Sequence, residues 1–408
     1  GAKAHVIGAL DQVAWLLNVR AADIEFTPVV VSYAVVTLRG CTIYVDSRKV
    51  TKGAAAALKG KAQIKDYDEA WNDLRALGQK KLNVWIDPAT TNRRVYDKLK
   101  GSTFHFAASP IAAMKAVKNA KQIAGITEAH RRDGIAMVKF LKWLPGAVKK
   151  GGVTEITASD QLTAFRAEDK SFKDCSFGTI SGYAANGAII HYSATKKSAK
   201  KLRPKGIYLI DSGGQYPDGT TDITRTVALG KPTPRQIECF TRVLMGTIDC
   251  TITPFPAGTT GQRNEMFARR ALWMIGEDYA HGTGHGVGQY LGVHEGPHSL
   301  KNLVSPPFVE GNLMSIEPGH YENGRFGIRI ENLAFVRKNE KLSRNGKTWY
   351  SFHAVTLCPI DRRLIDKKLM TKDQINWLND YHKRVYRELA RGLDKDHKEW
   401  LAKATRPI

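Results

Sequence analysis

The pattern of hydrophobic and polar residues first predicts a small domain of strands and helices. Apolar runs at 29–38 and 41–47 predict two adjacent strands with Gly40 near the turn between them. An amphipathic stretch at 113–144 then predicts one long helix, stopped by Pro145. The change of pattern before that helix places a domain boundary near residue 112.

Beyond this boundary, the pattern is dominated by strands. Four are predicted, at 206–216, 220–230, 312–319 and 326–336. The PDG triplet at 217–219 is a turn signal that joins the first two. Thr371 and Gln374 form a capping box that opens a final helix. The chain therefore predicts the α+β class, with a smaller α/β domain at 1–112 and a larger α+β domain at 113–408.

The composition favours a cytoplasmic protein. The chain has 408 residues, 42% hydrophobic and 25% charged, and no apolar run reaches the roughly 18–20 residues that span a bilayer. Five scattered cysteines without a C-x-x-C pair indicate reduced thiols. We therefore expect neither a disulfide framework nor contact with a membrane.

The net charge of +23 raises the question of a nucleic-acid partner. The positive charge is spread over both predicted domains, so no basic arm stands out. The densest basic run, at 195–205, has no interleaved aromatic residues on which bases could stack. It is a solvated basic loop or an anion-binding patch, and we expect no nucleic-acid partner.

Candidate chemistry lies at the ends of the predicted strands. Asp211 ends one apolar strand, Asp222 lies in the next, Glu317 closes another just before Pro-Gly, and Glu331 lies in the strand after that. An ionised carboxylate in such a place is costly unless it is paired or binds a metal. One of them alone could be a cap or a salt-bridge partner, but four together with a histidine indicate a metal centre.

The charge of this set matches two divalent cations. Four carboxylates and one neutral imidazole supply about −4, and the absence of thiolate favours Mn²⁺, Co²⁺ or Fe²⁺, with Zn²⁺ tolerated. Two cations that share carboxylates can bind a bridging water, lower its pKa and polarise a carbonyl group. The residues alone thus predict a dinuclear hydrolase.

A glycine-rich segment, HGTGHGVGQYLGVHEGP at 281–297, contains three histidines. Together with DSGGQYPDGTTDITRT at 211–226, EPGHY at 317–321 and FGIRIEN at 326–332, it resembles aminopeptidase P, the Xaa-Pro aminopeptidase family of the pita-bread metallopeptidase fold. The similarity extends over nearly the whole chain and is closest to the eukaryotic cytosolic form. It implies a creatinase/prolidase-like domain at 1–112, the middle domain of that form, whose first domain has no counterpart in this sequence.

The resemblance implies a role for individual residues. The metal ligands would be Asp211, Asp222, His285, Glu317 and Glu331. Asp222 and Glu331 would bridge the two ions, and Glu317 would also handle the proton of the attacking water. Glycines would let the backbone and the ligand approach closely around His285.

Further residues would surround this centre by the same resemblance. His294 would steady the scissile carbonyl, His281 would line the proline pocket and His191 would order the substrate. Arg329 and Tyr321 would brace the ligand carboxylates, and strand geometry directs Thr224 to the side of Asp222. The alternatives are surface or core histidines and, for Arg329, an ordinary salt bridge.

The implied reaction is the release of any N-terminal residue from peptides with a penultimate proline. By the same resemblance the enzyme would be a homodimer, and Mn²⁺ would be the preferred ion among the possible ones. Prolidases and methionine aminopeptidases share the ligands, but VHEGP (293–297) and GAIIHY (187–192) favour aminopeptidase P, and the intact ligands argue against a metal-free creatinase-like enzyme. The alternative of another class is a catalytically silent module that binds nucleic acid or charged proteins. One departure is His320, where the family usually has Tyr, close enough in sequence to Glu317 to modulate metal affinity.

Overall fold

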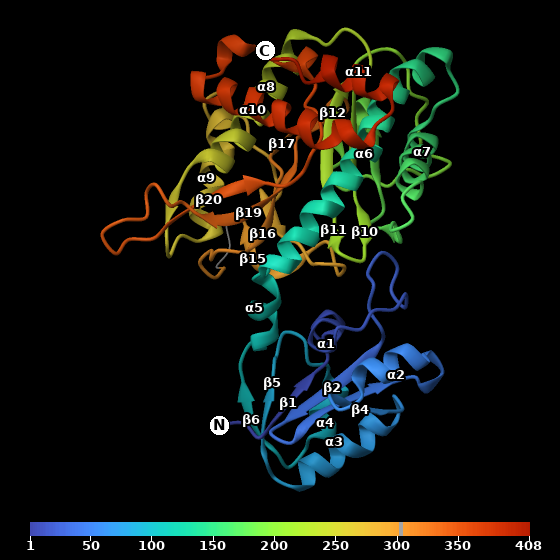
Figure 1. Ribbon diagram of the computed structural model, residues 1–408, viewed down its shortest axis with the longest axis vertical. Coiled ribbons are helices and arrows are strands. Elements are labelled where there is room, and N and C mark those ends of the chain that lie inside the picture. The colour runs from blue at the N-terminus through green and yellow to red at the C-terminus, as the bar shows by residue number, and fades with distance from the viewer. Residues whose placement is uncertain (302–304) are drawn as a thin grey trace. The chain divides into compact units, whose positions relative to one another are not determined.

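The computed structural model describes residues 1–301 and 305–408, which form two compact units, Gly1–Lys115 and Ala116–Ile408 (Figure 1). The division lies close to the boundary expected at residue 112. Helices and sheets occur in both units, which confirms the α+β class. Among the described residues, none of the helices combines the length and the apolar character that crossing a bilayer requires.

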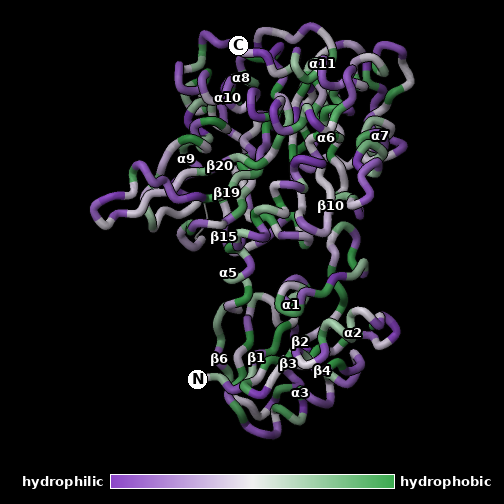
Figure 2. Tube along the Cα trace, viewed as in Figure 1, coloured by the Kyte–Doolittle hydropathy of each residue, from purple (hydrophilic) through white to green (hydrophobic). Residues whose placement is uncertain are grey.

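The N-terminal unit is built on one sheet with the strand order β4-β3-β2-β1-β5-β6. The β1–β2 and β2–β3 pairs are antiparallel and the others are parallel. Hydrophobic residues run along β1 and β2 (green in Figure 2) and form the core against helix α3. The elements are β1 (Ala4–Ile7), α1 (Leu10–Leu17), β2 (Ser32–Thr37), β3 (Gly40–Val45), α2 (Lys52–Leu58), β4 (Ala62–Lys65), α3 (Glu69–Gln79), β5 (Asn83–Ile86), α4 (Arg93–Lys98) and β6 (Thr103–Phe106).

The helices from residue 110 onward are α5 (Pro110–Ala116), which ends at the division, α6 (Ala120–Lys150), α7 (Glu155–Ala167), α8 (Pro234–Ile252), α9 (Gly261–Trp273), α10 (Lys372–Leu389) and α11 (Lys395–Ala404). The bounds 113 and 144 that the sequence predicts for a single helix are both wrong. A capping box of Asn119 and Gln122 starts α6 after a break, and the helix continues through Pro145. Pro145 removes one backbone hydrogen bond, but Leu144 and Val148 are buried on either side of it and hold the helix against the core.

The strands of the C-terminal unit belong to several sheets. The largest has the order β13-β20-β19-β16-β14-β15, and smaller ones are β12-β9-β8, β11-β10-β7 and the β17-β18 hairpin. Their bounds are β7 (Asp174–Cys175), β8 (Ile180–Tyr183), β9 (Ile207–Ser212), β10 (Gly214–Tyr216), β11 (Gly219–Thr220), β12 (Ile223–Ala228), β13 (Phe255–Pro256), β14 (Gly284–Gly286), β15 (Glu295–Leu300), β16 (Leu313–Ile316), β17 (Gly319–Glu322), β18 (Phe326–Arg329), β19 (Asn332–Lys338) and β20 (Trp349–Ala354).

All four strands expected in this unit are divided between two strands. The stretch 206–216 divides into β9 and β10, 220–230 into the end of β11 and β12, 312–319 into β16 and the start of β17, and 326–336 into β18 and β19. At the first break the chain passes so close to its neighbour that a Cβ on Gly213 would lie 1.9 Å from the carbonyl oxygen of Thr221. Each break lets a run of apolar residues serve two sheets, and the candidate acids lie at or beside these breaks.

The core of this unit packs the buried face of α8 against the sheets and helix α10, which is followed by α11 and so is not the final helix that the sequence predicts. Phe240, Leu244 and Ile248 of α8 share one apolar cluster with Ile328 of β18 and Leu378 of α10. The capping box of Thr371 and Gln374 that the sequence predicts is present at the start of α10. This packing holds the strand ends that carry the candidate acids in fixed positions.

Candidate metal centre

The candidate site lies in a cavity of about 1010 Å³ in the C-terminal unit. Its lining includes most of the side chains singled out from the sequence: Asp211, Asp222, Glu317, Arg329, His191, His281, His285 and His294. Glu331 is buried beside this lining and Tyr321 is bonded to it. Elements far apart in the sequence thus bring the predicted residues together.

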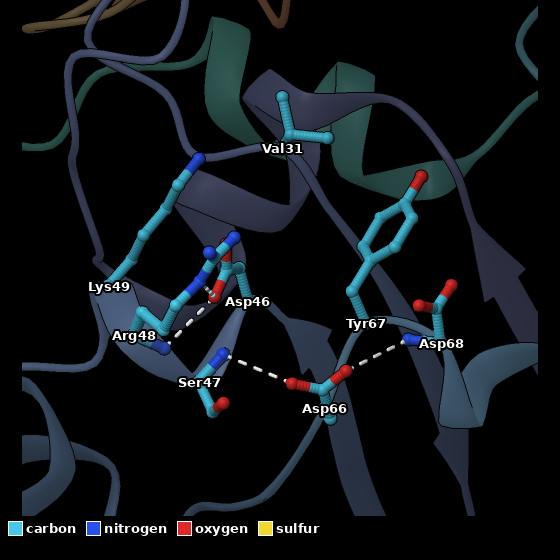
Figure 3. Close-up of a pocket in the computed structure, with 8 residues that line it drawn as sticks. All are labelled: Val31, Asp46, Ser47, Arg48, Lys49, Asp66, Tyr67 and Asp68. Atoms are coloured by element: carbon cyan, nitrogen blue, oxygen red, sulfur yellow. Dashed lines mark hydrogen bonds and ion pairs between the residues drawn. The ribbon is translucent and has the colours of Figure 1, made fainter.

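A second pocket, of about 490 Å³, lies in the N-terminal unit (Figure 3). Its charged groups are engaged with one another or with the backbone. Asp66 accepts hydrogen bonds from the amides of Ser47 and Asp68, and Arg48 pairs with Asp46. Exposed ion pairs of this kind stabilise little and present no unsatisfied ligand, so we place the functional site in the larger cavity.

The four carboxylates come from two pairs of strand ends. Asp211 lies in β9, and Asp222 immediately precedes β12, which pairs antiparallel with β9. Glu317 directly follows β16, and Glu331 lies in the break between β18 and β19. Two acids, Asp222 and Glu331, have ligand atoms that lie within 4.8 Å of each other and of an imidazole nitrogen of His285.

His285 is aimed at these carboxylates by the strand on which it lies. Strand β14 is squeezed between β15 and β16, and a Cβ on Gly284 would lie 2.0 Å from the carbonyl oxygen of Ser315. The Nδ1 of His285 donates to the carbonyl oxygen of Gly286 at 2.9 Å. Its Nε2 therefore faces Glu317 Oε1 at 3.3 Å and Asp222 Oδ2 at 3.5 Å, as a metal-binding histidine requires.

The electrostatics of the cluster disfavour the ionised form of its buried carboxylates. Burial raises the pKa of Asp222 to about 7, with Asp211 and Glu317 adding to the effect. Burial together with the neighbouring carboxylates likewise raises the pKa of Glu331 well above its ordinary value. For His285 burial alone would lower the pKa, but Asp222 and Glu317 raise it to about 9. Buried acids that resist ionisation in this way are stabilised by a cation among them.

Whether metal ions fit this cluster can be judged from two carboxylate oxygens that have no hydrogen-bond partner. Asp211 Oδ1 and Glu331 Oε1 are buried and have no hydrogen-bond partner, whereas the other oxygen of each group accepts a hydrogen bond, from Arg329 and Thr224 respectively. A buried acceptor without a partner is costly. Unpaired oxygens beside a histidine nitrogen form a donor set that suits hard divalent cations.

A chain of hydrogen bonds braces the acids and reaches one of the histidines. Arg329 donates to Asp211 Oδ2 at 2.6 Å, to Tyr321 Oη at 2.6 Å and to Thr224 Oγ1 at 3.2 Å. Tyr321 donates in turn to His281 Nε2 at 2.8 Å, because the Nδ1 of His281 donates to the carbonyl oxygen of Gly282. Thr224 donates in turn to Glu331 Oε2 at 2.9 Å. Asp211 and Glu331 are therefore linked to each other through Arg329 and Thr224.

The remaining two histidines lie at the open side of the cavity. His294 and His191 are exposed and line it without a hydrogen bond to the acids. The ring of His294 stands edge-on to that of His285, with centroids 4.3 Å apart. Desolvation and the neighbouring His285 lower the pKa of His294 to about 4, so its imidazole is neutral at pH 7. A neutral imidazole at this place can donate one hydrogen bond to a bound molecule.

The fold brings further residues to the site that the sequence did not indicate. Ser315 accepts from the amide of His285 and donates to Glu317 Oε1 at 3.0 Å, and its position two residues before Glu317 was a usable signal. Phe177 and Ile180 line the cavity from a segment with no recognisable pattern. His320, expected to act on Glu317, instead directs its ring nitrogens towards Glu277 and Glu322.

Arg329→Lys is expected to weaken metal binding by about 10–100-fold, the usual cost of removing a group that orients metal ligands. Lysine keeps the charge but cannot hold Asp211, Tyr321 and Thr224 at once. Metal affinity, measured by titration against a chelator, checks this prediction. Arg337→Lys, outside the cavity, is the matched control, and equal affinity in both variants would contradict the bracing role.

The sequence matches three family descriptions. Residues 124–338 match Metallopeptidase family M24, residues 1–122 match the Creatinase/Prolidase N-terminal domain, and residues 348–408 match the C-terminal region of peptidase_M24. Xaa-Pro aminopeptidase 1 of Dictyostelium discoideum is 39% identical over 99% of this chain and 66% of its own length. Aminopeptidase P1 of Arabidopsis thaliana is 37% identical over 100% of this chain and 71% of its own length.

Solved structures show the same architecture. The X-prolyl aminopeptidase from Caenorhabditis elegans, described as a cytosolic enzyme with a di-nuclear active site, superposes with a TM-score of 0.95 and 34% identity over 100% of this chain and 68% of its own. The prolidase from Pyrococcus furiosus superposes with a TM-score of 0.70 at 21% identity over 87% of this chain and 96% of its own, which shows the fold alone. The chain thus spans about two thirds of the length of the curated relatives it matches.

Proposed function

Since the chain belongs to metallopeptidase family M24, we propose that it is a metal-dependent aminopeptidase that cleaves the bond between any N-terminal residue and a penultimate proline. One observation carries the proposal: four carboxylates and His285 converge at a cavity, in an arrangement that a cation would stabilise. A silent binding module would have no need to retain such a costly cluster.

The metal ligands in this proposal are Asp211, Asp222, His285, Glu317 and Glu331. They would hold two divalent cations, Mn²⁺ by preference, and the di-nuclear description of the C. elegans structure supports that number. When bound, the cations supply Lewis acidity to the scissile carbonyl and lower the pKa of a water molecule.

The residues around the ligands then position the substrate and move protons. Glu317 takes up the proton of the attacking water, since its carboxylate is partly exposed to the cavity and is held by Ser315. His294, neutral at pH 7, donates to the substrate carbonyl oxygen and supports the charge that develops there. His191 contacts the substrate from the open side, where it is exposed.

The preference for proline follows from the cavity wall. A proline imide has no N–H to satisfy, so an apolar surface is sufficient around the ring. Phe177, Ile180 and Val293 supply apolar lining, and His281 is held in a fixed orientation by Tyr321. The free α-amine of the substrate is cationic and is attracted by the acidic cluster.

The test is mass-spectrometric cleavage of an Arg-Pro-Pro peptide with an Arg-Ala-Ala peptide alongside, in Mn²⁺ and in chelator. We expect release of Arg from the proline peptide alone and only with metal. Equal cleavage of both peptides would retain the metal centre and contradict the proline pocket at His281. Cleavage of neither by a folded, metal-loaded protein would favour the binding module. Cytoplasmic location and a homodimer are parts of the same proposal, which fractionation and light scattering test.

A further inference from the structure

A second cluster of metal-ligand side chains lies outside the candidate metal centre. Ligand atoms of Cys239, His320 and Glu322 all lie within 4.8 Å of one another. Cys239 belongs to helix α8, and the other two belong to strand β17. None of these residues takes part in the proposed catalytic centre, so the two clusters can be considered separately.

The placement of the cluster follows from strand and helix geometry. His320 and Glu322 are two residues apart on β17 and therefore point to the same side. Tyr321, between them, points to the other side and bonds Arg329 and His281. The cluster thus lies on the face of the β17–β18 hairpin that packs against α8, opposite the face that braces the catalytic acids.

The spacing of the atoms suits a shared cation better than direct hydrogen bonds. His320 Nε2 lies 3.5 Å from Glu322 Oε1, longer than the roughly 2.7–2.9 Å of a good charge-assisted hydrogen bond. Zinc bonds of about 2.0–2.3 Å in tetrahedral geometry separate neighbouring ligand atoms by about 3.3–3.7 Å. The observed distance falls in that range.

The other nitrogen of His320 supplies an independent observation. Its side chain is 2% exposed, and Nδ1 has no hydrogen-bond partner. The nearest acidic oxygen, Glu277 Oε2, lies 3.8 Å away. A metal-binding histidine commonly directs its second nitrogen to a carboxylate, which fixes the ring and makes it a better ligand. Glu277 lies where that carboxylate is needed.

We propose that Cys239, His320 and Glu322 bind a Zn²⁺ ion, with Glu277 orienting His320 and a water completing the coordination. Sulfur, nitrogen and oxygen ligands together favour zinc over manganese or calcium. The ion would tie α8 to the hairpin that carries Tyr321 and Arg329, so its role is structural.

Two arginines partly compensate the negative charge around the cluster. The carboxylates of Glu277 and Glu322 and a Cys239 thiolate carry −3, whereas Arg235, which bonds both carboxylates, and Arg325, which bonds Glu322, supply +2. The cluster is left with a net negative charge, which a bound cation offsets. Arg235 also holds Glu322 ionised: burial alone would raise the pKa of Glu322, but the hydrogen bond and the charge of Arg235 help to outweigh burial and lower that pKa.

Zinc binding at this site releases a proton: the S–H bond of Cys239 breaks, the S–Zn bond forms, and one proton leaves to solvent.

Cobalt substitution distinguishes this site from the catalytic centre, because the proposed catalytic ligands include no thiolate. Chelator-stripped wild-type protein titrated with Co²⁺ is expected to develop the near-ultraviolet absorption of a cobalt–thiolate bond, and added Zn²⁺ to remove it. Cys239→Ser is expected to lose the absorption. Cys250→Ser changes another buried cysteine of α8 and is expected to retain it, as the matched control.

A second variant and the wild-type protein itself also test the zinc site. His320→Gln leaves every cysteine in place and is expected to lose the cobalt–thiolate absorption, which covers the case in which Cys239→Ser fails to fold. Absence of the absorption in wild-type protein that has bound Co²⁺ would overturn the proposal, and so would its persistence in Cys239→Ser or His320→Gln. Loss of peptide hydrolysis plays no part in this readout, so it stays separate from the proposed activity.

Discussion

Glu331→Gln is expected to lower kcat/KM for a penultimate-proline peptide by more than about 100-fold and to reduce the bound metal. Removing a group that only orients a ligand costs about 10–100-fold, and Glu331 is at the centre of the cluster itself. Its side chain is buried, one oxygen accepts from Thr224, and the other has no partner. Glutamine keeps the shape but removes the charge that a cation requires.

The same variant is expected to fold normally without metal. Burial and neighbouring carboxylates raise the pKa of Glu331 well above its ordinary value, so ionisation of this side chain is costly without a metal and neutral glutamine avoids that cost. Elemental analysis of bound metal and calorimetric unfolding check both parts.

Asp249→Asn is the control for this variant, since Asp249 is a half-buried carboxylate of α8 that accepts from Gln374 and lies outside the cavity. It is expected to retain metal and activity. Full metal content and full activity in Glu331→Gln would show that the cluster is not the reactive centre.

Arg225→Met is expected to destabilise the C-terminal unit by about 3–5 kcal/mol, the range found when a buried charged network loses one partner. The Arg225 side chain is buried and is held by acceptors from distant parts of the chain. It donates to the carbonyl oxygens of Thr224, Glu331, Cys358 and Pro359, to Asn332 Oδ1 and to Tyr381 Oη. Methionine fills the volume but leaves these acceptors without their donor.

Differential scanning calorimetry measures this effect as a lower Tm for the larger unit, by roughly 5–15 °C. The control is Arg387→Met, because Arg387 is exposed and pairs only with the adjacent, partly exposed Glu388 among the ion pairs found. Its stability should change by no more than about 0.5 kcal/mol. Equal shifts in the two variants would mean that the Arg225 network contributes nothing specific.

The position of Arg225 shows why the sequence indicated the acids together with Arg329, Tyr321 and Thr224, but not this arginine. Arg225 is next to Thr224 in a strand, so it points away from the side of Asp222 and looks like an ordinary charged residue. Apart from the adjacent Thr224, its partners lie more than 100 residues further along the chain. No local sequence pattern indicates such a residue, because its contribution to stability depends on segments that meet only after folding.

The misplaced helix and the broken strands have a similar cause. Periodicity at 113–144 indicated a helix correctly but could not show that Asn119 restarts it or that buried neighbours carry it past Pro145. The apolar run at 326–336 indicated a strand but not the break at Glu331, which separates two sheets. The spacing of hydrophobic residues shows which face of a helix or strand is buried, but it does not show which sheet that face packs against.

The sequence by itself determined the α+β class and, through four acids beside apolar strands and a glycine-rich histidine segment, a set of candidate metal ligands. These are local signals, since a carboxylate at the end of an apolar strand is costly wherever the strand goes. Only the tertiary structure decided that Thr224 joins Glu331 to Arg329, that Ser315 holds His285, and that Cys239 meets His320. Those contacts link residues far apart in the chain, and packing of the helices and sheets, not local sequence, sets their distances.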